Sequence, residues 1–329
     1  MKFASTVRAA VALIAVLAFA SARAETPTLR VGLPSLSLYT IVHHIAQDRG
    51  FFDREGVKVS LDHFESGSTN MKALLGRSVD VADVETALIL GASISGADLR
   101  MVGTHCLGLH YGLYVKSEIG SLKGLYGNRF GISGIGGLPH VVLLALLNQS
   151  GLDPSKVQLL TVGGTGARLK ALAAGKVDAT LGEFSPTIEA EPGLRRLMIV
   201  SKELPLYMSQ GLAVWSDTAT SKKDALERWQ RGLIKATRWV YDNKAEFIVA
   251  AQKHLPMSTE ELSKIYDAYV EARVWAINGE LEVKRLEYMQ DLGLKTKTQA
   301  QPTDLKKLVA SEITDQAVKA IGVRTYPAR

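Results

Sequence analysis

Apolar positions with the two-residue period of β-strands alternate with segments of helical period in the first two thirds of the chain. Residues 29–33 and 57–61 have the strand pattern, and residues 39–49 between them have the period of an amphipathic helix. A short helix at 71–75 and a strand at 79–84 follow. Because strands that alternate with helices form parallel sheets with right-handed crossovers, the pattern predicts an α/β fold.

One stretch of this pattern occurs twice. Residues 70–85 align without a gap with residues 168–183, and six of the 16 aligned pairs are identical. An Arg-x-Gly triplet precedes each copy, at 30–32 and at 129–131. Two copies of one βαβαβ unit predict two similar lobes. The alternative is a chance similarity between two ordinary crossovers, because α/β units share their composition.

The remaining segments suggest how the lobes are connected. Two apolar strands, residues 107–117 and 211–216, are candidates for crossings between the lobes. After residue 221 the pattern is helical, Ser258 with Glu261 predicts a capping box, and we interpret these helices as a scaffold packed on lobe I. The expected organisation is a signal peptide at 1–24, lobe I at 25–115, lobe II at 116–210, and the return strand and C-terminal helices of lobe I at 211–329.

The first 24 residues have the features of an export signal. Lys2 and Arg8 precede an unbroken apolar run at 9–20, and Ala22-Arg23-Ala24 is a small-x-small cleavage site. The run is shorter than the roughly 20 residues of a membrane span. We therefore expect a cleaved signal peptide and a periplasmic protein.

Charge and cysteine content exclude several classes of protein. The net charge is +6, and removing the three basic residues of the signal leaves +3, with no run of five Lys or Arg that would indicate a nucleic-acid partner. Cys106 is the only cysteine, so neither an intramolecular disulfide nor a cysteine-based zinc site can form.

Candidate binding residues lie where predicted strands end and helices begin, which is where open parallel sheets bind ligands. These loops are rich in Gly, Ser and Thr. Glu85 and Glu183 end the two copies of the repeat and could accept hydrogen bonds from amino or ring N–H groups of a ligand. Alternatively, they pair with Lys116, Arg129 or Arg168 and hold the lobes together.

We expect neither a metal nor a cofactor. His43 and His44 are adjacent, and neighbouring helical residues point about 100° apart, so both cannot easily reach one ion. No HExxH, G-x-S-x-G or P-loop pattern is present. His63, His105 and His110 are interpreted as core or surface histidines, and we expect no enzymatic activity.

The segment 45–57, with Gly50-Phe51-Phe52 and Gly56-Val57, resembles the helix exit of periplasmic solute-binding proteins. The similar group binds nitrate, taurine, aliphatic sulfonates and thiamine-related pyrimidines. Residues 73–82, 121–125 and 171–179, together with His140, resemble the same group in order along both lobes.

This resemblance implies a two-lobed periplasmic binding protein fold of type II. Each lobe would be a mostly parallel sheet flanked by helices, with two hinge crossings between the lobes. A monomer would close on a small solute and deliver it to an ABC permease in the inner membrane. Carried over by position, the pocket would comprise Ser35, Ser37, Tyr39, Ser68, Glu85, Ser133, Gly136, His140, Thr165 and Glu183.

The leading hypothesis for the ligand is a sulfonate or another organic anion, held by helix N-termini from both lobes. A heteroaromatic amine such as a thiamine-precursor pyrimidine is the alternative, and it suits Glu85, Glu183, Tyr39 and Phe184. Two more hypotheses stay open: an enzyme on the same fold, and a binding protein that serves a sensor instead of a permease.

Overall fold

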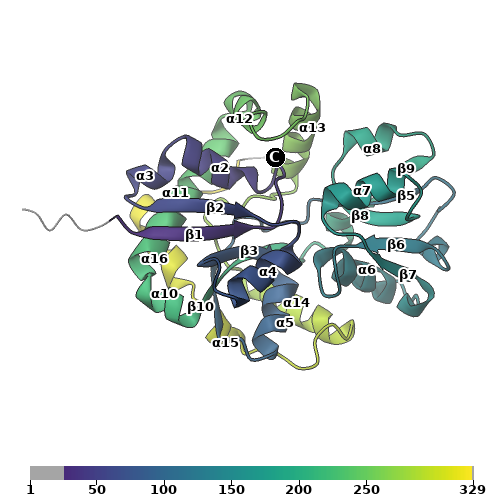
Figure 1. Cartoon of the computed structure of the whole chain (residues 1–329), viewed down its shortest axis with the longest axis horizontal. Coiled ribbons are helices and arrows are strands. Elements are labelled where there is room, and N and C mark those ends of the chain that lie inside the picture. The colour runs from purple at the N-terminus through teal and green to yellow at the C-terminus, as the bar shows by residue number, and fades with distance from the viewer. Residues whose placement is uncertain (1–25, 328–329) are drawn as a thin grey trace, which may run out of the picture.

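A computed structural model describes residues 26–327, so the predicted signal peptide lies outside the described residues. The chain forms two lobes, each built on one five-stranded sheet (Figure 1). The strands of lobe I, in sheet order, are β2 (Lys58–His63), β1 (Thr28–Leu33), β3 (Val81–Glu85), β10 (Gln210–Trp215) and β4 (Leu99–Gly103). Those of lobe II are β7 (Gln158–Thr161), β6 (Arg129–Ile132), β8 (Ala179–Glu183), β5 (Tyr111–Lys116) and β9 (Leu194–Ile199).

The two sheets have the same mixed topology. In each, four strands run in the same direction, and the fifth strand, which arrives from the other lobe, lies between two of them and is antiparallel to both. That strand is β10 in lobe I and β5 in lobe II. The predicted α/β two-lobed fold is confirmed, with each sheet mixed by its exchanged strand.

Helices cover both faces of each sheet. Lobe II has the smaller set: α6 (Leu138–Gln149), α7 (Thr165–Ala173), α8 (Pro186–Ala190) and α9 (Val200–Glu203). The N-terminal part of lobe I has α2 (Ile41–Asp48), α3 (Phe51–Arg54), α4 (Gly67–Leu75) and α5 (Thr86–Ile94). Its C-terminal part has α10 (Ser216–Ser221), α11 (Lys223–Asp242), α12 (Lys244–Ala251), α13 (Thr259–Glu271), α14 (Val283–Lys295), α15 (Leu305–Leu308) and α16 (Glu312–Ile321).

The repeat found in the sequence produces the same ion pair in both lobes. Arg30 on β1 donates its backbone N–H and its guanidinium to Asp80, which precedes β3. Arg129 on β6 makes the same contacts with Asp178 before β8. A lysine from elsewhere in the chain completes each pair, at 2.9 Å for Lys222 and 2.6 Å for Lys116. The carboxylate therefore fastens equivalent strands together in each lobe.

The first crossing between the lobes lies earlier than the expected boundary at residue 115. The strand β5 already pairs with β8 and β9 of lobe II, so the connection is the segment 104–110 between β4 and β5. The return connection is the segment 204–209 between α9 and β10. Both crossing segments are largely buried.

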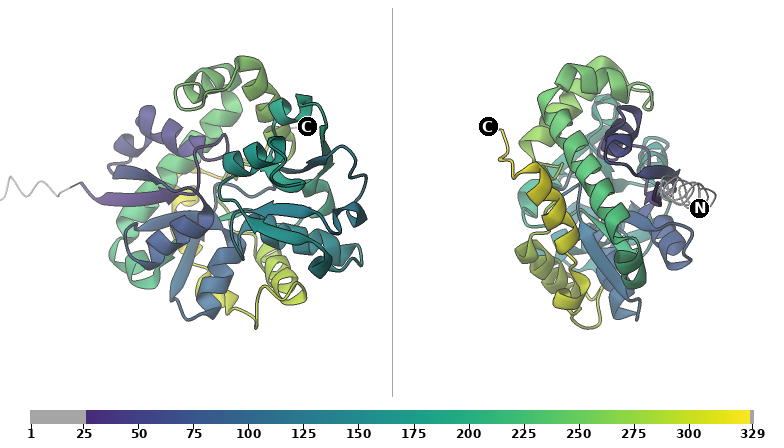
Figure 2. Two further views of the ribbon diagram at one scale, coloured as in Figure 1. Left: turned by 45° about the vertical axis from the view of Figure 1, so that its right-hand side comes forward. Right: turned by 90° about the vertical axis from the view of Figure 1, so that its left-hand side faces the viewer.

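The C-terminal helices pack on lobe I as expected. The long helix α11 lies beside α16 on the outside of the lobe (Figure 2) and buries Trp229 and Leu233 against α2 and the sheet. The capping box of Ser258 and Glu261 is confirmed, since each side chain binds the other's backbone N–H. The short helix predicted at 71–75 is longer in the structure, because Ser66 caps α4 and the helix begins at Gly67. Within residues 26–327, no helix combines the length and apolar character that a membrane span requires.

Candidate ligand-binding site between the lobes

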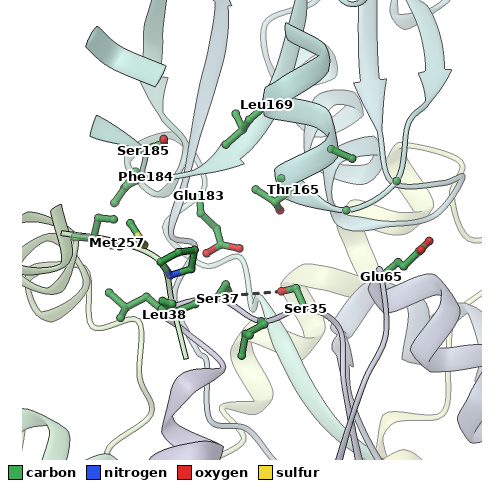
Figure 3. A pocket seen from close by; sticks show the side chains of 18 of the residues that line it. Ser35, Ser37, Leu38, Glu65, Thr165, Leu169, Glu183, Phe184, Ser185 and Met257 are labelled. Atoms are coloured by element: carbon green, nitrogen blue, oxygen red, sulfur yellow. Dashed lines mark hydrogen bonds between the residues drawn. The ribbon is translucent and has the colours of Figure 1, made fainter. Parts of the chain in front are cut away.

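A cavity of about 680 Å³ lies between the lobes. Loops after β1, β2, β7 and β8 line it, together with the C-terminal helices of lobe I (Figure 3). Its polar wall residues are Ser35, Ser37, Glu65, Thr165, Glu183, Ser185 and Tyr269. The lobes touch beside it, because a side chain at Gly164 of lobe II would collide with the backbone of Glu65 in lobe I. The cavity is therefore closed on this side by direct lobe contact.

Glu183 is the central acidic group of the cavity. It ends β8, and its carboxyl group points toward Ser37 of the opposite lobe (Figure 3). The Tyr269 hydroxyl donates to Glu183 Oε2 at 3.4 Å. Burial raises the pKa of Glu183 to about 7, although the Ser37 hydroxyl, the Arg168 charge and the Tyr269 hydroxyl oppose the rise. Near neutral pH this carboxyl group can therefore donate or accept a hydrogen bond.

A small inner niche adjoins the cavity and shares Ser35, Glu65, Gly164 and Thr165 with it. The other residues of the inner niche are Pro34, Tyr39, Ser66, Gly67, Glu85, Tyr111, Ser133, Pro139 and Arg168. Its volume of about 20 Å³ leaves room for little more than a water molecule. Polar groups from both lobes thus converge at the bottom of the cleft.

Glu85 occupies the N-terminus of α4 inside this niche. Its carboxyl group lies so close to Gly67 that a side chain there would collide with it. Burial raises the pKa of Glu85, and backbone N–H groups, including that of Leu138 at the start of α6, lower it. Glu85 Oε2 has no hydrogen-bond partner in the described part of the protein. A carboxyl group of the protein itself therefore fills the space beside Gly67 at the start of α4.

Arg168 is the basic group of the niche, and only 2% of it is exposed. Its guanidinium donates to the carbonyls of Leu181 (3.1 and 3.3 Å) and Gly163 (2.6 Å) and to Thr165 Oγ1 (3.1 Å). No ion pair joins it to Glu85 or Glu183 among the described residues. The Arg168 charge lowers the pKa of both Glu85 and Glu183 without direct contact, while its N–H groups bind backbone carbonyls.

The sequence model of the family described as "NMT1/THI5 like" matches residues 39–247. The chain belongs to the NMT1/THI5-like family. No curated protein sequence matches it. Solved structures share the fold at low sequence identity, and the family resemblance expected from the sequence is confirmed.

Two of these structures are binding proteins. The alkanesulfonate-binding protein SsuA from Xanthomonas axonopodis pv. citri, bound to MOPS, is 19% identical with a TM-score of 0.73 and covers 87% of this chain and 100% of its own. The periplasmic nitrate-binding protein NrtA from Synechocystis PCC 6803 is 14% identical with a TM-score of 0.74 and covers 91% of this chain and 90% of its own. A third, DszB in complex with biphenyl-2-sulfinic acid, is 18% identical with a TM-score of 0.62 and covers 90% and 99%.

Seven of the ten residues expected in the pocket of this NMT1/THI5-like protein line the cavity or the inner niche: Ser35, Ser37, Tyr39, Glu85, Ser133, Thr165 and Glu183. Ser68, Gly136 and His140 line neither. His140 Nδ1 accepts the Gly136 N–H at 3.1 Å, and Ser68 packs against the same glycine loop. These three residues shape the loop at the start of α6, and their assignment to the pocket stays a prediction.

The alternative that basic residues neutralise Glu85 and Glu183 receives little support from the geometry. Lys116 and Arg129 both pair with Asp178, at 2.6 and 2.8 Å, at the opposite end of β8 from Glu183. Arg168 is near, but its donors are directed to backbone carbonyls. Neither glutamate is therefore neutralised by an ion pair among the described residues, and Glu183 faces the cavity.

The interpretation of the C-terminal helices as scaffold alone was incomplete. Leu255, Pro256, Met257, Ile265 and Tyr269 form one wall of the cavity. They lie about 70 or more residues beyond Glu183 in the chain, and most are apolar, so nothing in their pattern distinguished a cavity wall from an ordinary core face. Only Tyr269, whose hydroxyl needs a polar partner when buried, carried a signal.

Proposed function

We propose that this protein is the substrate-binding component of an ABC importer, acting in the periplasm and delivering a small organic solute to an inner-membrane permease. The observation that carries the proposal is the cavity enclosed by residues of both lobes, in a chain of the NMT1/THI5-like family. The two crossing segments give the lobes a place to hinge, and closure would bury the solute. The SsuA and NrtA structures, which share this fold, support the same role.

The charges of the cleft favour a ligand with amino or ring N–H groups over an organic anion. Among the described residues, Glu65 and Glu183 line the main cavity and no Lys, Arg or His does. The Glu85 carboxyl group adds a third acidic group and fills the space beside Gly67 at the start of α4. The apolar walls include Phe64, Phe184 and Tyr269, which suit a flat aromatic ring. We therefore propose a neutral or cationic heteroaromatic amine as the ligand class.

Isothermal titration calorimetry with aminopyrimidines, taurine, alkanesulfonates and nitrate tests this choice. We expect heat from one or more aminopyrimidines and weaker or no binding of the anions. Glu183→Gln should weaken amine binding at least tenfold, whereas Glu203→Gln, an exposed glutamate on α9, should leave it unchanged. Binding of a sulfonate with unchanged affinity in Glu183→Gln would overturn the proposed ligand class and leave the transport role intact.

A non-enzymatic role remains our proposal, although the fold also occurs in DszB, which was solved with a sulfinic acid. Cys106, the only cysteine of the chain, is buried and lines neither the cavity nor the niche. Mass spectrometry of the bound ligand before and after prolonged incubation tests this point, because turnover would change its mass. Light scattering tests the expected monomer.

A further inference from the structure

A second cluster of chemistry-bearing side chains lies in lobe I, beneath the inner niche. His43 on α2, Asp83 on β3 and His105 in the first crossing segment converge there. His105 Nδ1 lies 3.3 Å and His43 Nε2 lies 3.6 Å from Asp83 Oδ2. All three residues are at most 1% exposed. Neither the cavity nor the proposed function uses them.

None of the six side-chain nitrogen and oxygen atoms of this cluster makes a hydrogen bond of normal geometry within the described part of the protein. Burying one polar group without a partner costs about 1–3 kcal/mol, and an ionised carboxylate costs more. Buried polar groups therefore nearly always have partners. Six polar atoms without a well-oriented hydrogen bond at one buried point leave room for a bound ion to satisfy them.

Lobe II shows that the fold does not require a carboxylate at the position of Asp83. In the repeat, Asp83 aligns with Leu181, and the carbonyls of both accept a side-chain donor from the equivalent helix, Asn70 in lobe I and Arg168 in lobe II. The strand position is thus structurally the same, with an apolar side chain in lobe II. The carboxylate of Asp83 is a feature of lobe I alone.

We propose that His43, Asp83 and His105 bind one divalent transition-metal ion of the zinc type. Two imidazoles and one carboxylate form a common three-residue ligand set, with the fourth position left for water. Ligand atoms at the usual Zn–N and Zn–O distances of about 2.0–2.2 Å lie about 3.4 Å apart in a tetrahedral site. The separations of 3.3 and 3.6 Å agree with that geometry, and the three ligand atoms all lie within 4.8 Å of one another.

The surroundings suit a cation. His43 and His105 are buried beside the Asp83 carboxyl group, and among the described residues no Lys or Arg pairs with that carboxyl group. Glu85, two residues after Asp83 on the same face of β3, adds a second buried carboxyl group nearby. The ion would tie α2, β3 and the first crossing segment together. Tyr39 lies between it and the niche, stacked on His105 at 5.9 Å.

This proposal differs from the expectation of no metal, and the reason for that expectation still holds. His43 and His44 do point apart: His43 faces the buried cluster, and His44 faces a surface cluster with His63 and His254. The partners of His43 come from elsewhere in the chain. The surface cluster provides a matched control, because it is partly exposed and has its own contacts, 2.8 Å for His44 with His63 and 2.8 Å for His254 with Asp48.

The test uses the full mature protein without a histidine tag, unfolded with chelator and refolded with or without Zn²⁺, since a buried site is filled during folding. Elemental analysis after dialysis should find about one Zn²⁺ per chain in the wild type. Asp83→Leu, which copies the residue of lobe II, should hold less than a tenth as much, and His63→Ala should hold as much as the wild type. Refolding with Co²⁺ should give the visible absorption of a tetrahedral site in the wild type and His63→Ala but not in Asp83→Leu.

Thermal unfolding gives a second readout. Zn²⁺ should raise the melting temperature of the refolded wild type and leave that of Asp83→Leu unchanged, because only a folded state that binds the ion is stabilised by it. Asp83→Asn, which is nearly the same shape, replaces Asp83→Leu if the leucine variant does not fold. A wild type that refolds without retaining Zn²⁺ or Co²⁺ overturns the proposal. So does retention by Asp83→Leu with loss in His63→Ala, which would place the metal at the surface cluster. Neither outcome bears on ligand binding in the cleft.

Discussion

The two lobes have the same strand order and the same ion pair at one edge, yet they differ where the repeated unit faces the cleft. Asp80 and Asp178 fasten equivalent strands with nearly identical contacts. At the start of the helix that precedes each of these aspartates, however, lobe I has Gly67 where lobe II has Thr165. The repeat therefore preserves the scaffold and the glutamate at the end of the strand, whereas the residue at the start of the preceding helix differs between the lobes.

The glutamates that end the repeats illustrate this difference. Glu85 lies against Gly67 and is 7% exposed, whereas Glu183 stands away from Thr165 and extends into the cavity. Gly67 has no side chain, so the Glu85 carboxyl group can lie against the start of α4. In lobe II the Thr165 side chain occupies the equivalent position at the start of α7. The same residue at the same position thus becomes a wall group in lobe I and a ligand-facing group in lobe II.

The largest expected effect comes from substitutions at Asn70 and Arg168, the equivalent helix positions whose side chains bind a strand carbonyl in each lobe. Arg168→Leu should lower the free energy of unfolding by about 4 kcal/mol. The substitution leaves the buried carbonyls of Gly163 and Leu181 unpaired, and it removes the positive charge that stabilises the ionised forms of Glu85 and Glu183. Asn70→Leu, which loses one hydrogen bond to the Asp83 carbonyl, should cost about 2 kcal/mol. Urea unfolding measures both, and equal costs would show that the arginine charge contributes nothing.

The second prediction concerns the first residue of α4 and of α7, each replaced by alanine. Gly67→Ala should destabilise the protein by about 2–3 kcal/mol, because the new methyl group collides with the Glu85 carboxyl group. Thr165→Ala, the matched change in lobe II, loses the contact with Arg168 and should cost about 1 kcal/mol. Thermal unfolding compares the two variants. A tolerated Gly67→Ala would mean that Glu85 can leave the niche.

The third prediction concerns pH. The pKa of Glu183 rises on folding from 4.5 to about 7, so the folded protein holds this proton more tightly than the unfolded chain. Its contribution to stability is complete below pH 4.5 and is lost as the pH rises through about 7. Because the carboxyl group is partly exposed to the cavity, we expect a loss of about 2 kcal/mol. In urea unfolding without ligand, Glu183→Gln should match the wild type at pH 4 and exceed it at pH 8.

The smallest effect should be alike in the two lobes. The Arg30 and Arg129 guanidinium groups hold the pKa values of Asp80 and Asp178 below their usual range. Their contribution is present above about pH 4 and is lost as the pH falls through the lowered values. Asp80→Asn and Asp178→Asn should each cost about 1 kcal/mol at pH 7. Urea unfolding measures both losses of stability. If they differ by more than about a factor of two, the ion pair does not contribute equally to the two lobes.

Local patterns in the sequence were sufficient to predict the strand–helix alternation, the duplicated unit and the positions of Glu85 and Glu183 at strand ends. Each depends on residues close together in the chain or on a repeat that can be read directly. Seven of the expected pocket residues reach the cleft for the same reason, because the carboxyl ends of parallel strands meet at one edge of a sheet.

Tertiary structure alone decided the rest. Only folding brings Tyr269 of a C-terminal helix to Glu183, directs Arg168 to backbone carbonyls, and places His43, Asp83 and His105 at one point. The sequence determined which residues end strands and begin helices, since periodicity and capping act over a few residues. It did not determine which distant side chains share a buried space, because that depends on how whole elements pack.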